Sequence, residues 1–289
     1  METEMCDKVE RDKIESSWID SVRLEADRTE MLGQLYECIS EDDRLTASQQ
    51  GRLEYITTMS YIHDYLCDGA SILEIGAGTG RYSIALARAG YNVTAIELLE
   101  HNLEILRRNS TDLDNIEARQ GDALDLSEIE DDTYDMTLLF GPMYHLYDAE
   151  DQHKAIDEAI RVTRPGGTIM VAFLSAYAIM YTNYLYSGFK EGMAENFTDS
   201  WDVRHFKEQV FTGFDITEFE ELFTDKPVKW LKTVSADSVL EYGRRWSQLE
   251  MDEEEFEAYV RFHLATCEIR ELLGGSSHLL YICSKTEEV

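Results

Sequence analysis

The sequence is poor in proline, in paired cysteine and in basic residues, and each shortage excludes a class of protein. Its 289 residues include 3 Pro and 5 Cys. So few prolines leave no room for a proline-rich linker. The cysteines are odd in number, lie far apart and form no Cys-x-x-Cys pair, which argues against a disulfide framework and against zinc ligands at that spacing. We therefore expect no metal, a reducing compartment and a cytoplasmic location.

Long apolar runs are also missing, and the charge is strongly one-sided. No stretch approaches the ~18 uncharged apolar residues of a membrane-spanning helix, and the acidic start has no apolar segment typical of a signal peptide. Acidic residues outnumber basic ones by 58 to 26, which gives a formal net charge of −32. Such a surface repels phosphate backbones and anionic lipids, so we expect neither nucleic acid nor membrane as a partner.

The remaining composition predicts a globular chain with one main domain. Hydrophobic residues make up 44% and aromatic residues 11% of the sequence, which is enough to bury a sizeable core. We divide the chain into an N-terminal helical extension (1–50) and a main domain (51–289). Within this domain, 175–214 is rich in aromatic residues without a clear period. Its place after the fifth strand predicts a lid over the sheet edge. Its aromatic residues either line the pocket or form the lid's own core, and we favour the second.

Short apolar strands alternate with amphipathic helices from residue 71 to residue 174. The expected strands are 71–76, 92–98, 116–126, 134–141 and 167–174, and helices separate most of them. This alternation predicts right-handed crossovers and a parallel sheet that is covered on both faces. Two further strands are expected at 228–234 and 278–285.

Three glycines follow the first of these strands, in the segment ILEIGAGTGRYS. Gly76, Gly78 and Gly80 stand between a strand and a helix, where backbone N–H groups meet a ligand in doubly wound sheets. A dinucleotide site requires the spacing G-x-G-x-x-G, but Arg81 occupies the place of the third glycine. This departure argues against a nicotinamide-dependent oxidoreductase.

The segment LEIGAGTGR resembles the first motif of class I S-adenosylmethionine-dependent methyltransferases, E/D-x-G-x-G-x-G. Further segments follow in that family's order: VTAIE ends in Glu97, QGDALDL contains Asp122, and HLLYICSK is similar to the family's final strand. The resemblance covers residues 50 to 175 well and the C-terminal strands more loosely. It implies a Rossmann-like, doubly wound, mostly parallel seven-stranded sheet whose last strand is antiparallel.

The resemblance also implies S-adenosyl-L-methionine as cofactor and assigns residues to it. Glu97 matches the acid that holds both ribose hydroxyls, and Asp122 with Ala123 matches the pair beside the adenine. An arginine near the loop, Arg81 or Arg52, is able to pair with the cofactor's carboxylate. The complete set of expected cofactor contacts is Glu74, Gly76, Ala77, Gly78, Gly80, Arg81, Glu97, Leu98, Asp122, Ala123, Phe140 and Arg52.

The segment FGPMYHLYD after the fourth strand supplies the expected acceptor side. It resembles the G-P-x-Y-H-L of many small-molecule members, whereas Gly141 and Met143 depart from the D/N-P-P-Y/F/W pattern of methyltransferases that act on nucleic-acid bases. His145 is a candidate general base because its unperturbed pKa lies near neutrality. The alternative is a histidine that shapes the loop. Tyr144 is the second candidate catalytic residue.

These observations predict a methyltransferase that transfers a methyl group to N or O of a small-molecule acceptor. Two alternatives stay open: methylation of a protein or peptide side chain, which an open acidic groove favours, and a non-catalytic S-adenosylmethionine-binding module, which a pocket closed above the methyl group favours. The choice between monomer and homodimer is open as well. The substrate depends on loops whose conformation the sequence does not define.

Overall fold

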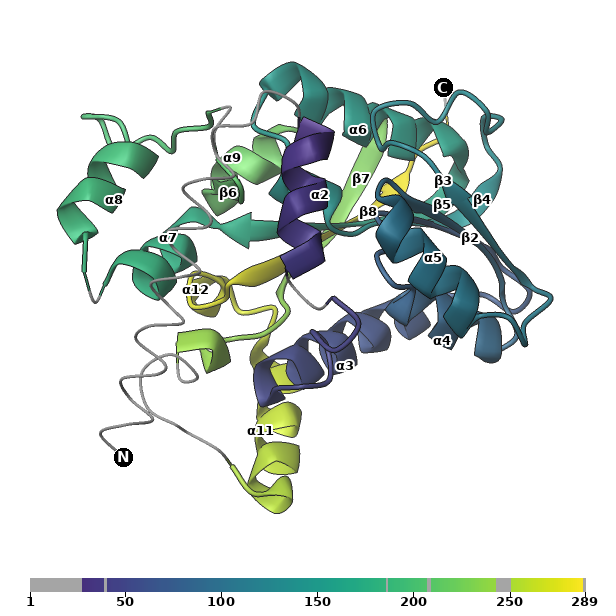
Figure 1. Cartoon of the computed structure of the whole chain (residues 1–289), viewed down its shortest axis with the longest axis horizontal. Helices are drawn as coiled ribbons and strands as arrows, with labels where there is room; N and C mark the ends of the chain where they lie inside the picture. Colours follow the sequence, from purple (N-terminus) through teal and green to yellow (C-terminus); the bar gives the residue numbers. More distant parts are fainter. Residues whose placement is uncertain (1–27, 39–40, 186, 207–208, 243–250, 288–289) are drawn as a thin grey trace.

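The computed structural model describes residues 28–38, 41–185, 187–206, 209–242 and 251–287. Its centre is an eight-stranded sheet with the strand order β3-β2-β1-β4-β5-β8-β7, and the short β6 pairs with β5 (Figure 1). The strands are β1 (Ser71–Ile75), β2 (Asn92–Glu97), β3 (Ile116–Gln120), β4 (Tyr134–Leu139), β5 (Thr163–Ser175), β6 (Gly213–Phe214), β7 (Val228–Ser235) and β8 (His278–Lys285).

The direction of the strands agrees with the expected fold. β1 to β5 run parallel, and β8 pairs antiparallel with both β5 and β7. The antiparallel last strand is thus confirmed. The strand beyond the expected seven is β6, whose two residues are too few to show an alternation in sequence. Because β8 is reversed, its first residue, His278, pairs with Leu174 near the carboxyl end of β5.

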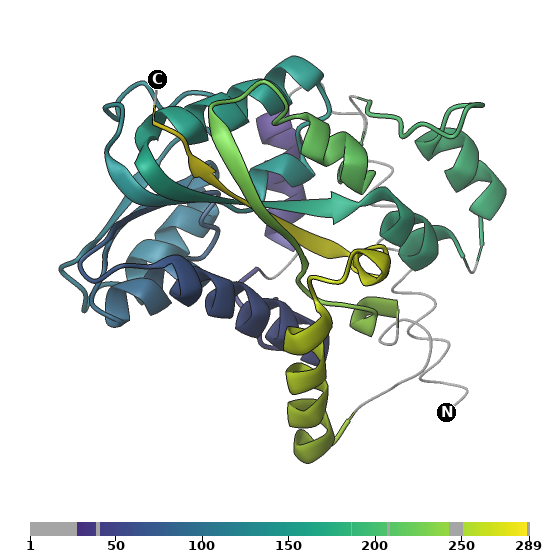
Figure 2. The ribbon, with the colours of Figure 1, turned by 180° about the vertical axis from the view of Figure 1, so that it is seen from behind.

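Helices cover both faces of the sheet (Figures 1 and 2). The longer ones are α2 (Arg28–Cys38), α3 (Gln49–Tyr65), α4 (Arg81–Arg88), α5 (Glu100–Asn109), α6 (Ala149–Val162), α8 (Phe189–Asn196) and α11 (Glu253–Thr266). The shorter ones are η1 (Pro142–Tyr144), α7 (Ala176–Ile179), the π-helical η2 (Met180–Tyr184), α9 (Ile216–Glu221) and α12 (Arg270–Leu273). Among the described residues, no helix combines the length and apolar character needed to cross a bilayer.

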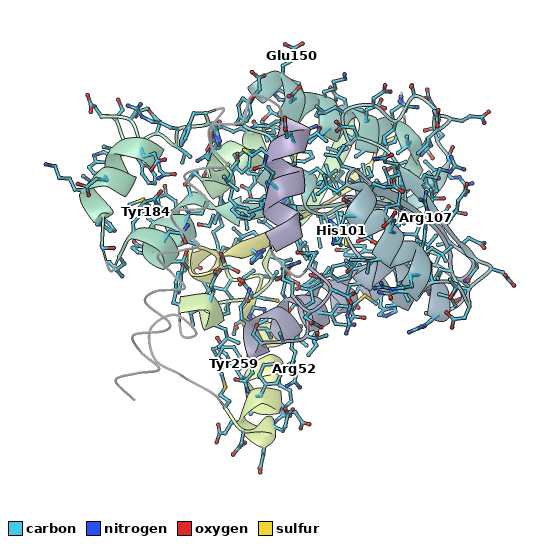
Figure 3. All side chains as sticks on the ribbon, in the orientation of Figure 1. Arg52, His101, Arg107, Glu150, Tyr184 and Tyr259 are labelled. Atoms are coloured by element: carbon cyan, nitrogen blue, oxygen red, sulfur yellow. The ribbon has the colours of Figure 1, made fainter. Side chains whose placement is uncertain are left out.

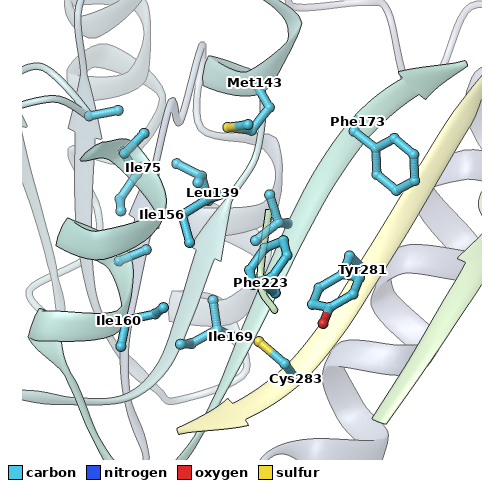
Figure 4. Close-up of a cluster of buried hydrophobic side chains, with 14 of the residues drawn as sticks. Ile75, Leu139, Met143, Ile156, Ile160, Ile169, Phe173, Phe223, Tyr281 and Cys283 are labelled. Carbon is cyan, nitrogen blue, oxygen red and sulfur yellow. The ribbon is translucent and has the colours of Figure 1, made fainter. Parts of the chain in front are cut away.

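Burial of both faces of β5 explains why the central strands are continuous apolar runs in the sequence. Successive side chains of a strand point to opposite faces. Ile169, Val171 and Phe173 belong to a cluster with α6 and α9, whereas Met170, Ala172 and Leu174 belong to a cluster with α3 and α4. Figure 4 shows the first cluster, in which Phe173 lies beside Tyr281. Burial on both faces fixes the register of β5 and therefore the place of the sheet edge where the strands end.

The N-terminal extension is described in part. Within the helical extension expected over 1–50, the structure describes α2, and the residues before Arg28 lie outside the described part. Figure 1 shows α2 crossing in front of the sheet, away from α8, which projects beyond the end of β5. The buried residues Met31, Leu32 and Leu35 attach α2 to the domain.

Candidate functional site

A cavity of about 210 Å³ lies at the carboxyl edge of the sheet. Its floor contains the glycine loop after β1, the end of β2 and the turn after β4. α2 covers it with Arg28, Leu32 and Tyr36. This is the position where open α/β sheets bind their ligands.

The glycine loop is shaped by close backbone packing. Gly76 has φ +81°, and a Cβ on it would lie 2.3 Å from the Phe140 carbonyl oxygen and 2.5 Å from Cδ of Pro142. Gly78 has φ +55°, and its N–H donates to Glu97 Oε2 at 2.8 Å. The loop therefore needs glycine for its conformation as well as for the approach of a ligand.

Glu97 stands at the end of β2 and is only 5% exposed. Its Oε1 accepts the Leu99 N–H at 2.9 Å, so both carboxylate oxygens are oriented by backbone donors. Burial raises the pKa of Glu97, and the N–H groups of Leu99 and Gly78 oppose that rise. A carboxylate has about four lone-pair sites, which leaves acceptor capacity toward the cavity for a diol such as a ribose.

Asp122 follows β3 and lies under the first turn of α2. Its Oδ1 accepts the Leu124 N–H at 3.0 Å, and its Oδ2 receives Nη2 of Arg28 at 2.6 Å. The two side chains are 32% and 17% exposed. α2 is thus fastened over the part of the cavity that the expected adenine contact occupies.

Glu74, the acid of the glycine motif, is 1% exposed and lines the cavity at the end of β1. Ser83 Oγ donates a hydrogen bond to its carboxyl group. Burial raises the pKa of Glu74 to about 8, so the group is mostly protonated at neutral pH. It therefore holds the first turn of α4 through Ser83 as a neutral hydrogen-bonding group.

Most of the other expected cofactor residues also reach the cavity. Its walls include Ala77, Arg81, Leu98, Ala123 and Phe140. Arg81 lies over the ring of Tyr55, 5.3 Å from its centroid.

Two expected contacts are not brought to the cavity. Gly80 faces α5, where a Cβ would meet Cγ of Leu106 at 2.7 Å. Arg52 pairs with both carboxylate oxygens of Glu253, at 2.8 and 2.9 Å, and lies 4.5 Å from the centroid of the Phe256 ring. Figure 3 shows Arg52 near Tyr259, where α3 meets α11. The face of α3 that carries Arg52 therefore packs against α11, whose Glu253 lies 201 residues later in the sequence. Sequence periodicity does not reveal such a contact.

His145 lines the cavity, but both of its ring nitrogens already have partners. Nδ1 lies 2.7 Å from the Val210 carbonyl oxygen, which only accepts, so Nδ1 carries the proton. Nε2 of the neutral ring then accepts from the Tyr36 hydroxyl at 3.0 Å. Burial lowers the pKa of His145 to about 4. This geometry favours the loop-shaping role over the general base. Tyr144, in contrast, lines the cavity with no hydrogen-bond partner for its hydroxyl among the described residues.

Replacement of Tyr36 by phenylalanine tests the structural role of His145. We expect the free energy of unfolding to fall by about 1–2 kcal/mol, because the buried Nε2 loses its partner. The measurement is urea denaturation of both proteins. An unchanged free energy of unfolding would show that the hydrogen bond between Tyr36 and His145 does not hold α2 in place.

A part of the cavity wall that contains Arg44, Glu54 and His278, called the far wall below, was not predicted from the sequence. Arg44 donates through Nη1 to both oxygens of Glu54, at 3.0 and 2.8 Å, and through Nε to Glu41 at 2.8 Å. His278 lines the cavity beside them and bonds to Asp237 through Nδ1 at 2.8 Å. In the sequence, the one indication of these residues was His278 at the start of the expected last strand.

The described residues of the aromatic insertion contribute little to the lining of this cavity. Of its described residues within 175–214, Phe211 alone lines the cavity, whereas α2 covers it. Phe197 instead packs with Ala176 and Met180, and its ring stacks on Tyr177 with centroids 5.9 Å apart. Among the insertion's described aromatic residues, Phe197 and Tyr184 thus join a small core, whereas Tyr181, Phe189 and Trp201 are exposed.

Comparison with known protein families agrees with this fold. Residues 72–167 match the family model described as "Methyltransferase domain". The strand order is that of the fold found in solved S-adenosylmethionine-dependent methyltransferases, and this part of the chain is similar to a methyltransferase domain. Glu97, Asp122 and the loop N–H groups, which the resemblance assigns to the ribose, adenine and methionine parts of S-adenosylmethionine, all line the cavity.

Individual relatives match parts of the chain. A demethylmenaquinone methyltransferase of Clavibacter sepedonicus is 39% identical over 108 residues, which is 37% of this chain and 42% of that protein. A cypemycin N-terminal methyltransferase of a Streptomyces species is 35% identical over 101 residues, 35% of this chain and 40% of that protein. The chain thus spans less than half the length of these relatives. A solved S-adenosylmethionine-dependent methyltransferase of Methanosarcina mazei shares the fold with 20% identity and a TM-score of 0.53, covering 79% of this chain and 98% of the other.

Proposed function

We propose that this protein transfers the methyl group of S-adenosylmethionine to nitrogen or oxygen of a small molecule held in the cavity. The observation that carries the proposal is the continuity of the cavity. It runs from Glu97 and Gly78 past Tyr144 to Ala236 and His278. A purely cofactor-binding module needs no space beyond the methyl group, whereas a transferase needs room there for an acceptor.

The walls of this far part favour a small acceptor with both apolar and polar groups, because the charged residues Arg44, Glu54 and His278 lie there among apolar side chains. Ala172, Leu174, Leu280 and Phe211 line it, and α2 covers it. The bound cofactor supplies an activated methyl group. The residues of this chain hold the acceptor in line with that group and exclude water, which is the main contribution that a displacement of this kind requires.

Methylation of a peptide is the second candidate, because one relative is named as an N-terminal methyltransferase. A peptide would have to insert its end under α2. The covered cavity fits a free small molecule better than a chain that continues beyond the site.

Calorimetry and a labelling experiment test the proposal together. We expect S-adenosylmethionine and S-adenosylhomocysteine to bind with micromolar affinity, and NAD not to bind. With methyl-labelled cofactor and a cell extract divided by ultrafiltration, we expect label in the small-molecule fraction. Label in the protein fraction would favour the peptide reading. Absence of binding by both sulfur ligands would contradict the cofactor assignment.

A further inference from the structure

The pair of Asp237 and His278 has a geometry that the cofactor site does not explain. Asp237 is completely buried and follows the end of β7, and His278 begins β8. Asp237 Oδ2 accepts from His278 Nδ1 at 2.8 Å and from Gln50 Nε2 at 2.7 Å. Nδ1 therefore carries a proton.

The second oxygen of Asp237 is also saturated, which fixes the carboxylate. Oδ1 accepts from Ser276 Oγ at 2.7 Å and from the N–H groups of Ser277 and His278 at 3.0 and 3.1 Å. Five donors thus hold one buried acid in a single orientation. Such an arrangement fixes the ring of His278 in turn, as an acid does when it orients a catalytic histidine.

Nε2 of His278 is the ring nitrogen left for a ligand. It has no hydrogen-bond partner among the described residues, and His278 lines the cavity with its ring edge-to-face to Tyr144, at 5.9 Å between centroids. The hydroxyl of Tyr144 on the same wall likewise has no side-chain hydrogen-bond partner within the described part of the chain. The two groups together can bind one oxygen atom of an acceptor.

Three charged groups face His278: Glu54 on α3, Asp237 after β7 and Arg44 before α3. The neutral hydroxyl-bearing ring of Tyr144 on η1 faces it as well. Burial alone would lower the pKa of His278, but the carboxylates of Glu54 and Asp237 outweigh it and raise the pKa to about 9. The ring is therefore cationic at neutral pH and loses its charge as the pH rises through about 9. A cation at this place repels an ammonium group and attracts an oxyanion.

A metal site is the competing interpretation, since ligand atoms of Glu54, Asp237 and His278 lie within 4.8 Å of one another. The donors described above already occupy both Asp237 oxygens, and Arg44 binds both oxygens of Glu54. A guanidinium in contact with the cluster further disfavours a second cation. The cluster is built to orient a histidine.

We propose that Asp237 and His278 hold the acidic hydroxyl of an aromatic or enolic acceptor as its anion, with the proton on Nε2, for methylation at oxygen. This inference rests on the proposed function and specifies its acceptor. The hydroxyl releases its proton to solvent on binding, and the Nε2–H of the cationic ring donates a hydrogen bond to the resulting oxyanion. An oxygen lone pair then forms the bond to the methyl carbon, and the electron pair of the broken carbon–sulfur bond stays on sulfur. The ring keeps its proton when the neutral ether leaves.

The test uses 4-nitrophenol, whose anion absorbs visibly, with protein saturated in S-adenosylhomocysteine. At a pH where the free probe is mostly neutral, we expect the bound probe to show the spectrum of its anion. His278→Gln should abolish that spectrum. The control His63→Gln changes an exposed histidine in the last turn of α3 and should retain it.

Three outcomes overturn the inference: a bound probe that stays neutral, an anion spectrum that persists in His278→Gln, and no binding of the probe at all. Because His278→Gln could fail to fold, ¹⁵N-histidine NMR of the unaltered protein gives an independent reading. It should show the proton on Nδ1 of His278 at high pH and a pKa above that of free imidazole. The proposed function itself is read by the S-adenosylhomocysteine titration, so the two failures are distinguishable.

Discussion

Glu97→Ala is expected to weaken the binding of S-adenosylhomocysteine on the order of 100-fold or more. The reason is the loss of two charge-assisted hydrogen bonds to the ribose, each contributing ~1.5–3 kcal/mol. The same change releases the N–H groups of Gly78 and Leu99, which the carboxylate now orients. Isothermal calorimetry measures the affinity directly.

Two further variants make this prediction specific. Glu97→Gln keeps one acceptor oxygen, so its affinity should lie between those of the unaltered protein and Glu97→Ala. Glu104→Ala removes an exposed acid on α5 and should leave the affinity unchanged. An affinity in Glu97→Ala within about threefold of the unaltered value would mean that Glu97 does not hold the ribose, since such a difference is worth less than 1 kcal/mol.

Gly76→Ala is expected to lower the free energy of unfolding by about 3 kcal/mol or more. A left-handed conformation costs an L-residue ~1–2 kcal/mol, and forcing a methyl group into packed atoms adds ~1–3 kcal/mol. At Gly76 both apply, because φ is +81° and the new Cβ would meet the Phe140 carbonyl oxygen at 2.3 Å. Urea denaturation gives the difference.

Gly69 offers a matched control for this substitution. Its φ of +76° is nearly the same, but nothing lies within 4 Å of a Cβ built on it. Gly69→Ala should therefore lower the free energy of unfolding by only the conformational share, ~1–2 kcal/mol. Equal losses in the two variants would show that the turn after β4 yields to the methyl group, and the loop would then be less tightly packed than the structure indicates.

The alternation of strands and helices was predictable because its causes are local. Apolar residues on both sides of a strand such as β5 produce a continuous run in the sequence, and a helix produces a period of 3.6. The resemblance to class I methyltransferases pointed to the acids after β2 and β3, and it agrees with geometry because the carboxyl ends of parallel strands meet at one edge of the sheet. Glu97 and Asp122 stand at such ends and both line the cavity.

The far wall could not be predicted because distant parts of the chain build it. His278 lies 41 residues after Asp237, and Gln50, the other partner of Oδ2, precedes Asp237 by 187 residues. Contacts between distant residues also decide the role of His145, but here they argue against a predicted function. Its motif suggested a base, but Tyr36 and Val210, which are 109 and 65 residues away, occupy both ring nitrogens. No local pattern reports whether a nitrogen is free.

The reversed direction of β8 places a site residue on a strand instead of a loop. A loop accepts insertions and deletions, but a strand that packs against a different cluster on each face, as β8 does, does not, because a shift of one residue exchanges its two faces. In β8, His278 pairs with Leu174 and Leu279 with Phe173. Slippage by one position would turn the imidazole away from the cavity and put an aliphatic side chain in its place. The wall that faces the acceptor is therefore tied to the register of the whole sheet, and it can change by substitution far more easily than by a change in length.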